Sequence, residues 1–395
     1  MSQSVQRTVA PERAALLAAV EDLRGLLAGG AGEAERLGTL PASSLEALAG
    51  AGLFLLKLPV ELGGLEVDPV THLEVIEALA TIDAAAAWSA MIGSTSIGLL
   101  GAFLPDEAVA EIFAGGRIPR AAAVTTPAAT VVPADGGFLV SGRWRFASGI
   151  RHSQWLAGGG LVSAGADEPP RHRMFAFPTA AAEIVDNWHV AGLQGTGSSD
   201  FTLDDQLVPE SFTWDLFAGP PLRGGPLYNI RAPGFMANEH AGFALGVAQR
   251  ALDGIVEAAA TKRRGGGLVI APSSLASRPV FQRVVGECDL RLRAARALTI
   301  EVYEEAWATV VEGRPVEPRQ LAEMRGVAAF ATAVAVEITT HAFRYSGGSA
   351  LYLSGDLQRC LRDINGAAQH IAVSDVAYEN LGQFALGLPG ANPRG

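Results

Sequence analysis

The leading candidate for a residue that performs chemistry is a histidine near the C-terminal end of the sequence. His370 follows Gly366 by four positions, so a helix over this segment would place both residues on one face. The glycine would then leave room beside the imidazole for a flat ring. An imidazole has a pKa near neutrality and can hydrogen-bond to a ligand or exchange a proton with it. The residues alone equally allow a core histidine that donates to a backbone carbonyl, so both interpretations stay open.

A serine and a basic run are the next candidates. Ser148 precedes Gly149 at the end of a short β-type run, where its hydroxyl could bond the local backbone or a ligand. Arg263 and Arg264 follow Lys262 and stand before three glycines. Such a run is usually a solvated helix end, but guanidinium groups also suit phosphate oxygens. Neither feature identifies a reaction by itself.

The common catalytic signatures are missing from the sequence. The closest approach to a dinucleotide-binding GxGxxG motif, residues 195–200, lacks the last glycine, and no GxxxxGK[ST] motif is present. There is also no HExxH motif and no GxSxG motif, and the seven histidines are scattered. Nucleotide hydrolysis, metal-dependent hydrolysis and serine-hydrolase chemistry therefore have no support, and we expect no metal site.

Composition narrows the class further. With 49% hydrophobic and 18% charged residues, the 395-residue chain can bury a sizeable core. The net charge of −11 gives no basic field for nucleic acid or anionic lipid. Cys288 and Cys360 form no CxxC pair, which fits a reducing compartment and excludes a thiolate zinc site. The N-terminus lacks an apolar leader, so we expect a soluble cytoplasmic protein.

One uncharged stretch, residues 84–105, is long enough to cross a bilayer. It contains Ser89, Ser94 and Thr95 as well as three glycines, and it ends in a proline. This content favours a helix that is buried on all sides in a soluble core.

The chain changes its hydrophobic period twice, which predicts an α+β protein in three parts. Helical spacing up to position 120 predicts an N-terminal helical domain over residues 1–120. Short runs of period two predict a central antiparallel β domain, a sandwich or barrel, over residues 121–220. Long Ala-, Leu-, Arg- and Glu-rich segments predict a C-terminal four-helix bundle over residues 221–395. The expected bundle helices cover residues 242–262, 277–311, 318–345 and 357–383.

Several segments, in this order, resemble the acyl-CoA dehydrogenase superfamily over essentially the whole chain. They are LPVELGG at 58–64, SGRWRFASG at 141–149, GLQGTGS at 192–198, the glycine pair at 347–348, and LQRCLRD at 357–363 with the Gln-His pair at 369–370. The pattern is more similar to the flavin-dependent monooxygenase branch of that fold. This branch includes the oxygenase components of two-component aromatic hydroxylases and dibenzothiophene monooxygenase.

One departure separates the two branches. Dehydrogenases of this fold commonly carry a catalytic glutamate about nine residues after the Arg-Asp pair, and that position is Ile371 here. Isoleucine cannot remove the α-proton of a thioester, which requires a carboxylate base. Glu379 lies eight residues further on. Because some dehydrogenases take the base from another helix, an acyl-CoA dehydrogenase or related flavin oxidase stays as the alternative.

The resemblance implies a reaction and its partners. Reduced flavin, FMN first and FAD as a second choice, would arrive from a separate NAD(P)H-flavin reductase. With O2 it would form a flavin hydroperoxide that oxygenates a small organic substrate of the aromatic or heterocyclic class. Such a chain needs no nicotinamide-binding motif of its own. The resemblance also implies a homotetramer built through the C-terminal bundle.

The resemblance assigns roles to particular residues. His370 and Ser148 would be catalytic, and His370 would face the flavin. Arg264, and after it Arg263, would bind the flavin phosphate. The other expected flavin contacts are Phe146, Ser148, Trp188, Thr196, Ser198, Phe281, Gln282, Gly347 and Gly348. We expect structural roles for His152, His189, His240 and His341, whereas Trp88 and Asn229 receive no role.

Overall fold

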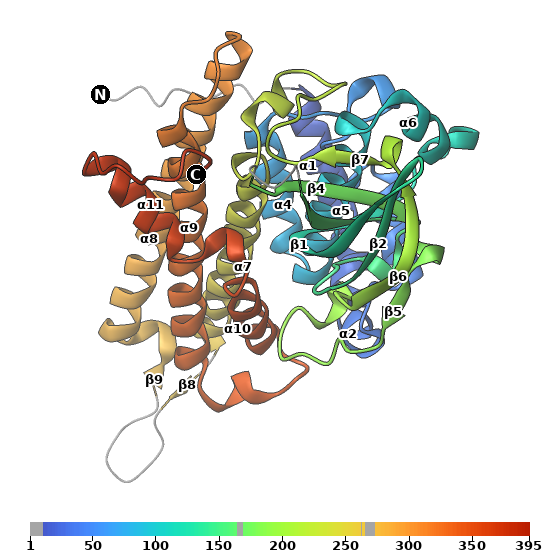
Figure 1. The fold of residues 1–395 in the computed structure, drawn as a ribbon. Helices are drawn as coiled ribbons and strands as arrows, with labels where there is room; N and C mark the ends of the chain where they lie inside the picture. Colours follow the sequence, from blue (N-terminus) through green and yellow to red (C-terminus); the bar gives the residue numbers. More distant parts are fainter. Residues whose placement is uncertain (1–10, 164–168, 262, 265–272) are drawn as a thin grey trace.

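The computed structural model describes residues 11–163, 169–261, 263–264 and 273–395. Figure 1 shows N-terminal helices and a sheet on one side of the molecule and a bundle of long helices on the other. The expected α+β fold class, with N-terminal helices, a central sheet and a C-terminal bundle, is confirmed.

The N-terminal helices begin at residues that suit helix starts. Asp68 precedes α4 and accepts hydrogen bonds from the backbone N–H groups of Val70 and Thr71, and Asp83 accepts one from Ala86 before α5. These carboxylates satisfy donors that the helix itself leaves free. The helices are α1 (Pro11–Asp22), α2 (Arg24–Leu37), α3 (Ala42–Gly50), α4 (Pro69–Ala80), α5 (Ala84–Phe103) and α6 (Asp106–Ile112).

The uncharged helix α5 is a core helix. Of the described helices, α5 and the segment Pro318–Leu351 are long and apolar enough to cross a membrane, but 83% of the apolar part of α5 is buried inside the protein. Two of its polar side chains have internal partners, since Ser94 bonds His72 of α4 and Thr95 bonds Glu239. The expected buried helix is therefore confirmed.

Seven strands form one sheet, in the order β5-β6-β2-β1-β3-β4-β7. The ring of Trp144 in β2 stacks on Phe201 of β6 at 4.9 Å, and its indole N–H donates to the carbonyl of Gly159 in β3. The strands are β1 (Ala121–Ala134), β2 (Gly137–Trp144), β3 (Trp155–Val162), β4 (Arg171–Pro178), β5 (Glu183–Val185), β6 (Asp200–Pro209) and β7 (Thr213–Asp215).

The sheet is mixed rather than wholly antiparallel. A two-residue turn joins β1 to β2 as an antiparallel hairpin, and residues 145–154 then carry the chain back to the start of β1. There β3 pairs in parallel with β1, with Ala121 opposite Trp155. The other pairings of the sheet are antiparallel. Ser148 lies in the segment that connects β2 to β3, at the end of the sheet where its hydroxyl meets Trp88 of α5.

The C-terminal bundle packs on the N-terminal helices through glycines of α7. A Cβ added at Gly242 would lie 2.4 Å from the carbonyl oxygen of Leu73, and one at Gly246 would lie 2.2 Å from that of Glu77. Only glycine therefore lets α7 approach α4 so closely. The elements are α7 (Gly234–Thr261), β8 (Arg263–Arg264), β9 (Ser273–Ser274), α8 (Pro279–Val311), α9 (Pro318–Ser346), α10 (Asp356–Ala367) and α11 (Val376–Ala385).

The fourth expected helix, residues 357–383, is wrong as a continuous element. The chain leaves α10 after Ala367, forms a short 3-10 turn at Ile371–Val373 and begins α11 at Val376. Side chains take the backbone groups that a helix would have paired. Nδ1 of His370 accepts the N–H of Ala372, and Arg325 of α9 donates to the carbonyls of Ile371 and Ala372. His370 therefore lies in extended backbone before this turn, not on a helix face with Gly366.

Candidate active site

Three rings from separate elements meet where α5, α7 and the end of α10 converge. The imidazole of His370 stacks on that of His240, with 4.2 Å between centroids and 30° between planes. Trp88 of α5 lies edge-on to both, 5.4 Å from His240 and 5.9 Å from His370. These contacts place His370 against a buried aromatic wall.

Hydrogen bonding defines the tautomer of His370. Its Nδ1 accepts the N–H of Ala372 at 3.2 Å, so the neutral ring carries its proton on Nε2. Within the described part of the chain, no hydrogen bond engages Nε2. Burial lowers the pKa of His370 to about 4, so the imidazole is neutral near pH 7. The site thus offers an Nε2–H donor to a ligand.

A line of buried hydroxyls continues from the same wall. The indole N–H of Trp88 donates to Ser148 at 2.9 Å, Ser148 bonds Ser198 at 2.7 Å, and Ser198 bonds Thr196 at 2.6 Å. Thr196 donates to the carbonyl of Leu193, which sets the direction of the whole line. Each hydroxyl then donates once and accepts once, and its second lone pair is left for a donor on a ligand.

Helix α10 holds the loop that carries these hydroxyls. The N–H of Leu193 donates to the carboxylate of Asp363 at 2.6 Å, and Arg362 donates to the carbonyl of Ala191 at 2.8 Å. Gly192 lies against the backbone of Arg362, where an added Cβ would be 2.0 Å from the carbonyl oxygen. Burial raises the pKa of Asp363 to about 7. One helix thus positions the hydroxyl loop and leads directly to His370.

Two partly exposed aromatic side chains lie beside the hydroxyls. Phe146 is 67% exposed, and its ring meets that of Trp188 edge-on at 6.3 Å. The indole N–H of Trp188 donates to the carbonyls of Leu193 and Gln194. The expectation that a strand reaches Phe146 and Ser148 is wrong, because β2 ends at Trp144 and Phe146 has a φ of +65°. The turn presents both residues away from the sheet.

A second group of expected contacts is separate from His370. Phe281 is buried against Tyr345, Gln282 donates to the carbonyl of Ala276, and Gly347 ends α9 with a φ of +66° beside Gly348. Figure 1 shows β8 and β9 at the end of the bundle, away from the junction of α10 and α11. The backbone of Arg263 and Arg264 pairs with β9, but their side chains lie outside the described part of the structure.

Sequence reasoning missed two members of the His370 group. Trp88 received no role and His240 was expected to be structural, yet both rings contact His370. No spacing in the sequence signals these contacts, because the three residues lie on elements far apart along the chain. Trp88 did fall within a segment of the N-terminal helices that the family resemblance covers.

The alternative catalytic carboxylate is not at this site. Glu379 is exposed in the first turn of α11, and Ile371 is 71% exposed. Across the described ranges, no carboxylate forms a hydrogen bond or ion pair with His370. The geometry therefore favours chemistry by an imidazole and hydroxyls over abstraction of a proton by a glutamate.

Known proteins resemble this chain over most of its length. Residues 11–108 match the N-terminal domain of acyl-CoA dehydrogenase, and residues 239–375 match its C-terminal domain. Indole-3-acetate monooxygenase of Pseudomonas putida is 32% identical over 391 residues, which are 96% of this chain and 95% of the relative. The oxygenase component of the FADH(2)-dependent resorcinol hydroxylase of a Rhizobium species is 28% identical and covers 98% of both chains.

Among solved structures, XiaF from a Streptomyces species, in complex with FADH2 and glycerol, superposes with a TM-score of 0.86. It is 26% identical, and the match covers 97% of both chains. The expected family is thereby confirmed, and this chain belongs to the flavin-dependent monooxygenases with the acyl-CoA dehydrogenase fold.

Proposed function

We propose that this enzyme takes up reduced flavin from a separate NAD(P)H-flavin reductase and adds one oxygen atom of O2 to a small aromatic or heterocyclic molecule. The observation that carries the proposal is the neutral His370, whose Nε2–H is free beside a line of buried hydroxyls, with no carboxylate bonded to it within the described residues. FMN is the first choice of flavin and FAD the second.

The residues present fit a reduced flavin. Its ring system is flat and apolar on both faces but carries N–H donors at its edge. Phe146 and Trp188 supply exposed aromatic surface, and the spare lone pairs of Ser148 and Ser198 can accept from those donors. When bound, the reduced flavin would supply the two electrons that activate O2.

The chain itself would orient the ligand, exclude water and donate a hydrogen bond. Ser148 would hold the edge of the ring system, while α5 and α7 keep water from the reacting atoms, because most of their side chains at this point are apolar or already bonded. The neutral ring of His370 carries its proton on Nε2, which would donate a hydrogen bond to the reacting oxygen.

An aromatic substrate is supported by the names of relatives and by the site. Relatives are named for indole-3-acetate and resorcinol, and both of these are aromatic. In this chain Trp88, His240 and Phe243 form a buried cluster of rings beside His370, and the exposed ring of Phe146 offers a flat apolar surface on which such a molecule can pack.

A homotetramer is supported by apolar side chains left exposed on the C-terminal helices. These residues, which a second copy could cover, are Leu290, Leu298, Leu351, Tyr352, Leu353, Ile371, Val376 and Leu386. Light scattering on the purified chain tests the assembly, and a monomer at micromolar concentration would contradict it. A cytoplasmic location fits the free thiols of Cys288 and Cys360, both of which are buried.

The experiment supplies the chain with NADH, a flavin reductase, either FMN or FAD, and ¹⁸O2, together with a panel of indoles and phenols. The expected result is a product that carries one ¹⁸O atom and depends on the reductase. Oxidation of an acyl-CoA with an artificial acceptor and without reductase would instead establish the dehydrogenase alternative.

A further inference from the structure

The face of His370 is covered by another imidazole. His240 is buried, and its ring lies nearly parallel to that of His370 at 4.2 Å. Edge contacts from Trp88 enclose both rings, and Phe243 packs edge-on to Trp88 at 5.1 Å. Such contact between two ring faces restricts how either ring can turn.

His370 has little else to restrain its ring. It lies in extended backbone between α10 and a 3-10 turn, and one hydrogen bond, from the N–H of Ala372 to Nδ1, holds the imidazole. The torsion that turns a histidine ring has a broad energy profile, so a single bond of 3.2 Å defines its plane poorly. The direction of Nε2–H therefore depends on the ring packed against it.

His240 itself is held rigidly by its neighbours in α7. Glu239 accepts from Lys57 at 2.9 Å and bonds Thr95 of α5, and Lys57 also donates to the carbonyl of Phe235 at 2.6 Å. Asn238 donates to the carbonyl of Pro69 at 3.0 Å. These bonds are buried, and breaking a buried pair of charges is costly. They fix the rotation of α7 about its axis at His240.

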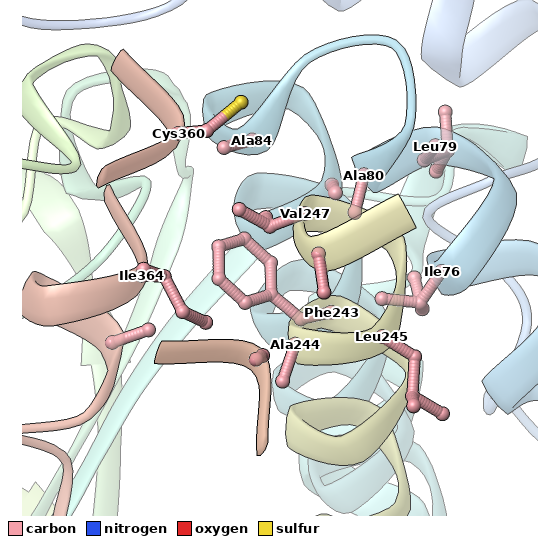
Figure 2. Close-up of a cluster of buried hydrophobic side chains, with 14 of the residues drawn as sticks. Ile76, Leu79, Ala80, Ala84, Phe243, Ala244, Leu245, Val247, Cys360 and Ile364 are labelled. Atoms are coloured by element: carbon pink, nitrogen blue, oxygen red, sulfur yellow. The ribbon is translucent and has the colours of Figure 1, made fainter. Parts of the chain in front are cut away.

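Apolar packing also fixes the position of the part of α7 that carries His240. Figure 2 shows Phe243, Ala244 and Val247 of α7 packed toward Ile364 and Cys360 of α10 and toward Ala80 and Ala84. The helix that carries His240 and the helix that leads to His370 thus share one buried cluster. Neither can shift without disturbing a core that is close-packed.

We propose that His240 is a positioning residue, whose stacked ring fixes the plane of His370 and so the direction of its Nε2–H toward the bound substrate and flavin. The proposal rests on the proposed function of His370. It requires a flat ring at position 240 but not a titrating one, which distinguishes it from a direct part of His240 in proton transfer.

Two variants separate these requirements. His240→Phe keeps a flat ring and removes both nitrogens, whereas His240→Leu fills the space without a flat face. The first measurement is the crystal structure of each flavin-free variant, in which the ring plane of His370 and its Nδ1 to Ala372 N distance are compared with wild type. The second is the amount of oxygenated product per reduced flavin consumed, with His189→Ala, an exposed histidine, as the matched control.

We expect the Phe variant to keep the orientation of His370 and a product yield within about threefold of wild type. In the Leu variant the ring should turn and the yield should fall about tenfold or more, because small misplacements are costly in catalysis. If the Leu variant does not fold, His240→Gln, which also lacks a flat ring, replaces it.

An unchanged His370 and an unchanged yield in the Leu variant would overturn the proposal. Loss of product in the Phe variant with His370 still in place would also overturn it, in favour of a chemical role for the nitrogens. If wild type itself forms no oxygenated product, the proposed function fails, and the crystal structures still decide what His240 does to His370.

Discussion

The two groups of residues that the family resemblance assigns to flavin differ in how far one chain assembles them. Around His370, ring contacts and a continuous line of hydrogen bonds join α5, α7, α10 and the loop before β6. At the end of the bundle, the ring of Phe281 packs against Tyr345, while the side chain of Gln282 donates to the backbone carbonyl of Ala276. Among the residues whose side chains the structure describes, one group is a connected site and the other is a set of separate positions.

This difference indicates a division of labour. Reacting groups need fixed geometry before the ligand arrives, and the buried network around His370 provides it. Residues that only grip a distant phosphate can be ordered by the ligand or by a neighbouring copy of the chain. The separate positions of the second group, as far as the structure describes them, fit the proposed tetramer if flavin lies between copies of the chain.

Removal of the central imidazole should have the largest effect. His370→Ala should lower the rate of product formation by on the order of 10²–10³, the usual contribution of a positioned hydrogen-bond donor at a reacting oxygen. The assembly should stay that of wild type, while the unfolding temperature should fall by a few degrees, because the packing of the ring on His240 and its bond to Ala372 are lost. Gln282→Ala, from the other group, should weaken flavin binding but leave the product per bound flavin unchanged. A normal rate in His370→Ala would remove the proposed distinction between the groups.

The grip of α10 on the hydroxyl loop should depend on pH. The pKa of Asp363 is about 7, raised by burial above 3.8, so between these pH values the folded chain holds a proton that the unfolded chain has lost. The free energy that this group contributes to folding is therefore full below about pH 4 and is lost as pH rises through about 7. Asp363→Asn keeps an acceptor for Leu193 but cannot titrate.

Relative to wild type, Asp363→Asn should gain stability on the order of 4 kcal/mol at pH 8 and little at pH 4. Urea unfolding of both proteins at the two pH values measures this difference, with Asp22→Asn on the exposed end of α1 as control. A difference in unfolding free energy between the two proteins that does not change with pH, or one of opposite sign, would contradict a buried carboxyl with a raised pKa. The result bears on the difference between the two groups, because in the described ranges no buried carboxyl of this kind holds Phe281, Gln282 or the glycine pair 347–348.

The sequence predicted most of the fold because its long elements carry strong periodicity. The buried helix α5 and the starts of α4 and α9 follow directly from apolar runs and from Asp-Pro and Pro signals. The break after α10 escaped prediction because no proline or glycine marks residues 367–375. It is made instead by side chains from elsewhere, chiefly Arg325, and by His370 itself.

Residue type and family resemblance selected residues that the structure brings together, but they gave no signal for contacts that depend only on tertiary packing. Ser148, Ser198 and Thr196 are joined, as a common set of flavin contacts would be. His240 and Trp88 gave no local signal, because stacking depends on how α5 and α7 pack, and that packing depends on glycines against α4. No short stretch of sequence specifies a contact between two elements that are distant along the chain.

A substitution at Arg264 tests whether the second group of expected contacts binds the flavin phosphate. Arg264→Ala should weaken binding of reduced FMN about tenfold, the loss of one charge-assisted phosphate contact. Its affinity for reduced riboflavin, which lacks the phosphate, should not change. Anaerobic titrations with both flavins give the ratio, and Arg263→Ala is the matched control. Equal losses for both flavins would place Arg264 elsewhere than at the phosphate, and no loss would pass the role to Arg263.

The smallest effect should come from the hydroxyl line, because its members can partly replace one another. Ser148→Ala removes the acceptor of the Trp88 N–H and one lone pair for the ligand, so the product per reduced flavin should fall about fivefold and stability by about 1–3 kcal/mol. Ser198→Ala interrupts the line one step further on and leaves the Trp88 bond intact, so its losses should be smaller. Product yield and thermal unfolding of the two variants check this order. A larger loss in Ser198→Ala would mean that the ligand meets the line at its far end, near Thr196, and that Ser148 serves the Trp88 ring alone.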